Sequence, residues 1–147
     1  MRTTLFVICF ILALAVQAKW SVGYYPYPYS KVEISSNPIY PVYGSIRFQT
    51  NSFISNLNTD LIFNWNFKQK EQVDFFTGAG IRFNLANFDS QDANPHVGQF
   101  LLLGARIYPF EKMRPLGLSF DISPFLNSDG KSGRIESNLG LFWCFGR

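Results

Sequence analysis

PLGLSFDISPF, residues Pro115–Phe125, alternates apolar and polar side chains along its length. The apolar positions are Leu116, Leu118, Phe120 and Ile122, and the positions between them hold Gly117, Ser119, Asp121 and Ser123. A two-residue period is that of a β-strand, whose successive side chains point to opposite faces. The class of protein depends on which face is inside. Leucines that line a core indicate a soluble protein, whereas an inward Asp121 leaves the leucines facing something other than water.

The same period recurs along the chain after residue 18, and we expect no helix there. Apart from the first segment, the clearest examples are Val42–Thr50, Thr59–Lys68, Val73–Leu85, Gln99–Phe110 and Arg134–Arg147. A strand from Trp20 to about Tyr25 precedes them. A closed sheet whose chain starts and ends on the same side has an even number of strands, which requires one more strand in Ser30–Tyr40. Pro38 and the serines of that segment disfavour it. The expected fold is all-β, an eight-stranded antiparallel up-and-down transmembrane barrel.

The connections between these segments differ in length. Lys68–Gln72 and Glu111–Arg114 are short, whereas Ala86–His96 and Asn127–Gly133 are longer and very polar. Short and long connections are therefore expected to alternate along the second half of the chain. Outer-membrane barrels show this alternation, because their periplasmic turns are short and their outer loops are long.

The two faces of the strands differ in charge. The face without charged side chains is expected to contact lipid through Phe63, Trp65, Phe75, Ile81, Phe83, Leu101, Leu103, Ile107, Leu118, Phe120, Ile122, Leu139, Leu141, Trp143 and Phe145. The other face mixes glycine, serine and asparagine with charges of both signs. We expect its charged members to form a lumen network of Arg47, Asp60, Asp74, Arg82, Arg106, Asp121, Arg134 and Glu136.

The composition of the polar face fits a narrow lumen better than a water-exposed wall. Exposed walls are usually rich in lysine and glutamate, but this face has few lysines and many glycines, which suit a tight space. An eight-stranded lumen is just wide enough for side chains to fill it, and buried charges need partners. We expect Arg82 or Arg106 to pair with Asp121. A salt-bridged plug is favoured over a selective pore, since an open channel needs more strands.

The N-terminal residues have the pattern of a secretory signal. Arg2 precedes an apolar run, Leu5–Val16, that is too short to span a bilayer, and Ala18 suits a signal-peptidase site. We therefore expect a cleaved signal peptide at 1–18 and an outer-membrane barrel domain at 19–147.

Composition excludes several classes of function. Cys144 is the only cysteine after residue 18 and His96 is the only histidine, so we expect no disulfide, metal site or cofactor. The formal charge of +3 is scattered without a basic block, which disfavours nucleic-acid binding. Aromatic residues make up 18% of the chain and charged residues only 16%, so few charges are left to face water.

The series TGAGIRF, LLLGARIYPF, PLGLSFDISPF and NLGLFWCFGR, between Val73 and Arg147, resembles small OmpA/OmpX-like outer-membrane β-barrel proteins, especially the short ones of Bacteroidetes-type bacteria. The resemblance implies a place in the Gram-negative cell envelope. It also implies recognition by the barrel assembly machinery through an aromatic-ended last strand. Phe145 holds that aromatic position, although Gly146 and Arg147 follow it. These motifs reflect barrel geometry and carry no catalytic signature.

The expected function is that of a non-catalytic, porin-like outer-membrane protein. We expect a monomer surrounded by outer-membrane lipid, whose structural, adhesion or surface-recognition role resides in the loops Ala86–His96 and Asn127–Gly133. One alternative is a secreted soluble barrel that holds an apolar ligand against its Leu/Phe face, as lipocalins do. The other is a lipid-modifying barrel enzyme in which His96 acts with a loop serine such as Ser90.

Overall fold

The structure, a computed structural model, describes residues 19–50, 57–89, 94–110 and 115–145. The expected signal segment at 1–18 lies outside these residues. Eight strands form the fold: β1 (Trp20–Tyr27), β2 (Lys31–Ser36), β3 (Val42–Gln49), β4 (Asn58–Gln69), β5 (Val73–Asn84), β6 (His96–Ile107), β7 (Leu116–Asn127) and β8 (Gly133–Cys144). A single 3-10 turn, η1 (Leu85–Asp89), follows β5. No helix in the described part of the chain is long and apolar enough to cross a membrane.

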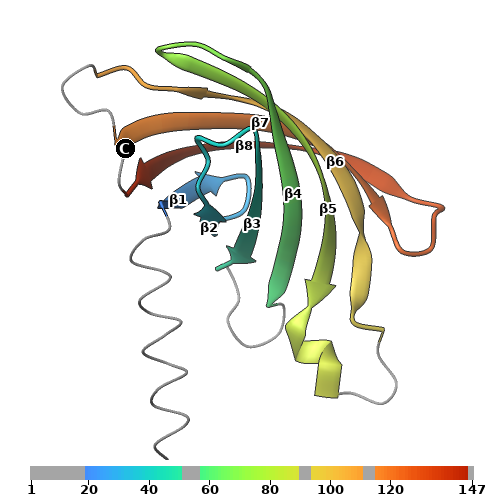
Figure 1. The fold of residues 1–147 in the computed structure, drawn as a ribbon. Helices are drawn as coiled ribbons and strands as arrows, with labels where there is room; N and C mark the ends of the chain where they lie inside the picture. The colour runs from blue at the N-terminus through green and yellow to red at the C-terminus, as the bar shows by residue number, and fades with distance from the viewer. Residues whose placement is uncertain (1–18, 51–56, 90–93, 111–114, 146–147) are drawn as a thin grey trace, which may run out of the picture.

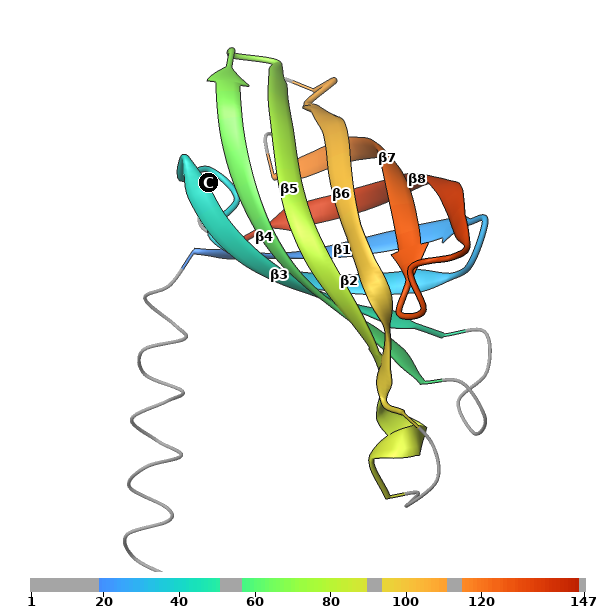
Figure 2. The same cartoon turned by 90° about the vertical axis from the view of Figure 1, so that its right-hand side faces the viewer.

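Each strand pairs antiparallel with the next one along the chain, and β1 pairs with β8, which closes the barrel (Figure 1). The expected all-β, eight-stranded, up-and-down architecture is therefore confirmed. Trp20 and Phe145 lie together at one end, which we call the terminal end, and their rings stack with centroids 4.2 Å apart. The opposite end is called the loop end, and η1 extends from it below β5 and β6 (Figure 2).

The two N-terminal strands differ in detail from the sequence expectation. The disfavoured strand forms, but only as Lys31–Ser36, so that Pro38 lies outside it. β1 continues to Tyr27, past the expected end at Tyr25, and its register against β8 shifts between Tyr24 and Tyr27. Pro26 has no N–H to donate to the ladder, which is consistent with a bulge at this point.

The expected alternation of short and long connections is wrong for the second half of the chain. The β6–β7 connection, Tyr108–Pro115, has 8 residues, whereas the β7–β8 connection, Ser128–Ser132, has 5. The difference arises because β6 ends at Ile107, before the expected Phe110. In addition, β7 and β8 extend into the polar segment that was expected to be a long loop.

Burial answers the question posed by the β7 sequence. Asp121 and Ser119 are completely buried inside the barrel, while Leu118, Phe120 and Ile122 are exposed on its outer wall. The other strands show the same orientation. Fourteen of the fifteen residues expected to face lipid are exposed, and the remaining one, Phe83, is half-buried beside His96. The outer wall is thus apolar and the lumen is polar.

Large rings fill the lumen where glycines leave room for them. A Cβ on Gly104 would lie 2.5 Å from the Phe76 ring and 2.6 Å from the Phe120 carbonyl oxygen. A Cβ on Gly117 would lie 2.3 Å from the Phe142 ring. The inward glycines are therefore required by packing, because each leaves the space that a buried aromatic side chain occupies.

A pair of Gly→Ala substitutions tests this packing. Gly104→Ala should destabilise the barrel by about 1–3 kcal/mol through overpacking. Gly44→Ala is the matched control, because a Cβ there points outward and meets nothing closer than 3.9 Å; its effect should stay below about 1 kcal/mol. Equilibrium urea unfolding followed by tryptophan fluorescence measures both. Equal effects of the two substitutions would contradict the inward orientation of Gly104.

Candidate functional site

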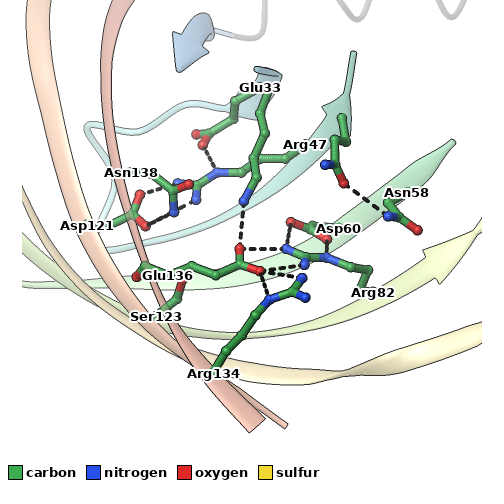
Figure 3. Close-up of polar contacts among 12 residues, drawn as sticks. Glu33, Arg47, Asn58, Asp60, Arg82, Asp121, Ser123, Arg134, Glu136 and Asn138 are labelled. Carbon is green, nitrogen blue, oxygen red and sulfur yellow. Dashed lines mark hydrogen bonds and ion pairs between the residues drawn. The ribbon is translucent and has the colours of Figure 1, made fainter. Parts of the chain in front are cut away.

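The lumen at the loop end holds a group of charges that we call the mouth cluster, formed by Lys31, Asp60, Arg82, Arg134 and Glu136. Glu136 on β8 is its centre and accepts contacts at 2.9 Å from Lys31 Nζ, 2.8 Å from Arg82 Nη1 and 2.8 Å from Arg134 Nη2. Arg82 also binds Asp60 through its Nε at 2.5 Å (Figure 3). Four of these side chains are buried, and that of Arg134 is half exposed.

A second group, the waist cluster, is centred on Arg47 of β3. Its Nε contacts Glu33 Oε2 at 2.5 Å and its Nη2 contacts Asp121 Oδ2 at 2.7 Å. Asn138 donates to the other oxygen of Asp121 at 2.7 Å, and the guanidinium lies 4.6 Å from the centre of the Tyr25 ring. The strands β3 and β7 are four places apart in a ring of eight, so the Arg47–Asp121 bond crosses the lumen at its full width.

Aromatic side chains surround the remaining buried arginine, at the terminal end. Arg106 donates a hydrogen bond to the Tyr43 hydroxyl, and its guanidinium lies 4.5 Å from the Phe76 ring centre and 4.7 Å from that of Tyr43. Asp74, its cross-strand neighbour, accepts a hydrogen bond from the Tyr108 hydroxyl at 2.9 Å. Cation–π contacts of this kind are strongest when the cation is desolvated, and they help to compensate the burial of Arg106.

All eight residues expected in the lumen network lie on the inner face, and seven of them are buried. They do not form one connected set. Asp60, Arg82, Arg134 and Glu136 belong to the mouth cluster, Arg47 and Asp121 belong to the waist cluster, and Asp74 and Arg106 lie at the terminal end.

The expected partner of Asp121 is wrong: its carboxylate binds Arg47 instead of Arg82 or Arg106. Arg106 turns toward the rings at the terminal end, and Arg82 is held by Asp60 and Glu136. Arg106 lies on the adjacent strand β6 and Arg82 on β5, whereas Arg47 lies on the opposite wall. In so narrow a barrel a long side chain from the opposite wall reaches just as easily.

Sequence reasoning missed two charged members of the network, Lys31 and Glu33. Both are buried and both lie on β2. The signal was present in the alternation of Lys31, Glu33 and Ser35, which repeats the polar-face pattern of the other strands. It was overlooked because Pro38 and the serines disfavoured the segment as a whole.

The Arg47–Asp121 bond spans the lumen at its waist, with the Tyr25 ring beside the Arg47 guanidinium. The described residues contain no group of three or more His, Cys, Asp or Glu side chains that could hold a metal ion. His96 begins β6, half-buried, with its ring 5.9 Å from that of Phe83. Ser90, the loop serine expected to act with His96, lies outside the described residues.

Neutralising Glu136, the centre of the mouth cluster, is expected to lower the stability of the barrel strongly. Glu136→Gln removes the carboxylate that binds Lys31 and leaves Arg82 paired with Asp60, and removing one member of a buried ionic group costs about 3–5 kcal/mol. The matched control is Asp129→Asn, an exposed carboxylate of the β7–β8 turn, which should change stability by less than about 1 kcal/mol. Urea unfolding of the two variants measures the difference. Similar unfolding midpoints would show that the network contributes nothing to stability.

Comparison with known proteins adds no further assignment. The chain matches no protein-family model, no curated protein and no solved structure.

Proposed function

We propose that this chain is a non-catalytic integral outer-membrane β-barrel whose structural, adhesion or recognition role lies at its loop end. The observation that carries the proposal is the inverted distribution of polarity. Charged groups are buried in the lumen, while large apolar side chains such as Phe63, Leu101 and Leu139, each more than half exposed, cover the outer wall. Contiguous apolar surface of this extent is rare on soluble monomers and is the normal outer wall of a membrane barrel.

The aromatic residues of the outer wall support the same proposal. Exposed Trp20, Trp143 and Phe145 gather at the terminal end, and exposed Tyr27 and Tyr29 lie at the loop end. Aromatic girdles at the two membrane interfaces have this arrangement. Strands β4 to β8 have 12 residues each, which is sufficient for a tilted strand to cross a bilayer, whereas β1, β2 and β3 have 8, 6 and 8. The closed ladder pairs backbone groups that lipid cannot satisfy, except on the β1 side of Gly133–Asn138, which β1 does not reach.

The lipocalin-like alternative requires the Leu/Phe face to line the cavity. In the structure that face is outside, and the lumen is filled by ion pairs and rings. The enzyme alternative requires a nucleophile or carboxylate on the imidazole of His96. In the described part of the chain, the ring of His96 packs beside the ring of Phe83. Neither alternative therefore has a specific observation in its favour.

Cell fractionation tests the location. We expect the protein in the outer-membrane fraction, resistant to extraction by carbonate or urea and released by detergent. A protein that is soluble and monodisperse without detergent would refute the proposal, because the exposed apolar wall would then face water.

Two arginine substitutions test which medium surrounds the wall. Leu101 and Tyr27 are similarly exposed, at 62% and 67%, but Leu101 is in the middle of β6 and Tyr27 is at the loop end of β1. In a bilayer, Leu101→Arg should cost about 2–4 kcal/mol and Tyr27→Arg at most about 1 kcal/mol. Unfolding from lipid vesicles in urea measures both. Around a soluble barrel, neither exposed substitution would destabilise, so two equally small effects would contradict membrane insertion.

A further inference from the structure

A bulge near the terminal end of β4 changes the face on which Lys68 lies. Asn64 and Asn66 are buried inside the barrel, and a strict two-residue period would place Lys68 with them. The register between β4 and β5 shifts after Asn66, so that Lys68 pairs with Phe75. Directly paired residues of an antiparallel ladder share a face, and Phe75 is exposed on the outer wall. Lys68 therefore belongs to the outer wall, where it is exposed.

Lys68 is the only charged side chain at an outward position of the eight strands, as far as the structure describes them. None of the ion pairs among the described residues involves it. In the neighbouring β4–β5 turn, exposed Lys70 and Glu71 have opposite charges and cancel. Inside the barrel, Asp74 and Arg106 face each other across β5 and β6 and also cancel. Lys68 thus leaves one net positive charge on this part of the wall.

Three exposed rings adjoin this charge. The centroids of Trp65 and Phe67 are 6.3 Å apart, and those of Phe67 and Phe75 are 6.4 Å apart. The same bulge that turns Lys68 outward leaves Phe67 on the outer wall beside Phe75. We call Trp65, Phe67, Lys68 and Phe75 the anchor patch. It presents a continuous aromatic surface with a single ammonium group next to it.

The depth of the anchor patch identifies the part of a lipid that it would meet. Lys68 is the last residue but one of β4, so in a barrel that spans a bilayer its ammonium group lies at the level of the headgroups, and the rings lie just below, beside the acyl chains. The anion available at that level is the lipid phosphate, which an ammonium group binds by charge-assisted hydrogen bonds. The terminal end, where Trp20 and Phe145 meet, faces the periplasm in the proposed orientation. The surrounding leaflet is therefore the phospholipid leaflet.

We propose that the anchor patch is a binding site for an anionic phospholipid. The lipid phosphate would accept hydrogen bonds from Lys68 Nζ, and an acyl chain would lie against the rings of Phe67 and Phe75. An anionic headgroup is favoured over a zwitterionic one because the latter brings its own cation next to Lys68, which has no carboxylate partner among the described residues. The inference rests on the proposed membrane location and adds to it the class of lipid that is bound.

Quenching of Trp65 by brominated lipids tests the inference, because Trp65 belongs to the patch. Trp20→Phe with Trp143→Phe leaves Trp65 as the only tryptophan of the chain. This variant is inserted into vesicles that mix phosphatidylglycerol with phosphatidylcholine, and one of the two lipids carries bromine. We expect phosphatidylglycerol to bind beside Trp65 at least threefold more tightly than phosphatidylcholine.

Further substitutions in the same variant separate a site at Lys68 from a general effect of charge. Lys68→Gln should reduce the preference to about one, whereas Lys68→Arg should keep it. Lys131→Gln, an equal charge change in an exposed turn at the loop end, should also keep it.

Three results would overturn the inference while leaving the membrane proposal intact. They are equal quenching by the two lipids, an unchanged preference after Lys68→Gln, and a Trp65 that a second copy of the chain shields from both lipids, seen as quenching restored on dilution into excess lipid without any preference. A barrel that does not insert, and whose Trp65 neither brominated lipid quenches, would refute both proposals. The two failures are therefore distinguishable in one experiment.

Discussion

The bond between Arg47 and Asp121 shows the constraint on which the rest of the structure depends: charges inside a narrow lumen must find partners there. Burying a guanidinium or carboxylate without a partner costs far more than any single packing contact supplies. The Arg47–Asp121 contact joins opposite walls of the lumen. Between neighbouring strands, the rings of Phe76 and Phe142 lie across from Gly104 and Gly117 and occupy the space that a Cβ at either glycine would need.

The sequence predicts the faces of this barrel better than it predicts the contacts inside it. A two-residue period assigns every side chain of β7 to a face, so the buried position of Asp121 could be inferred from its neighbours. The partner of Asp121 could not, because side chains from any wall reach the centre and the choice depends on rotamers and on competing ion pairs. The ends of the strands could not be predicted from the sequence either. Whether β6 ends at Ile107 or at Phe110 depends on pairing with β5, and periodicity alone carries no information about pairing length.

The same balance explains why the outer wall has so few charges. Charged and aromatic side chains occupy many of the inward positions of the eight strands. The outward positions are almost entirely apolar. In a soluble barrel of this size the distribution is reversed. Apolar side chains point inward, where water is excluded, and polar side chains point outward, where they contact water. Here the lumen combines ion pairs and cation–π contacts such as that of Arg106 with Phe76 with a buried apolar cluster that includes Phe100, Leu102 and Phe125. The wall is then free to match an apolar surrounding, which is the basis of the membrane proposal.

The charges of the loop end do not stand alone in the lumen. The mouth cluster and the waist cluster follow one another along it, so two layers of ion pairs support the loop end. The half-exposed side chain of Arg134 is held by Glu136, which is itself bound to Arg82 and Lys31, so it stands oriented before any partner arrives. A preorganised charge at a recognition surface lowers the entropy lost on binding. The network that stabilises the barrel would in this way also shape its recognition surface.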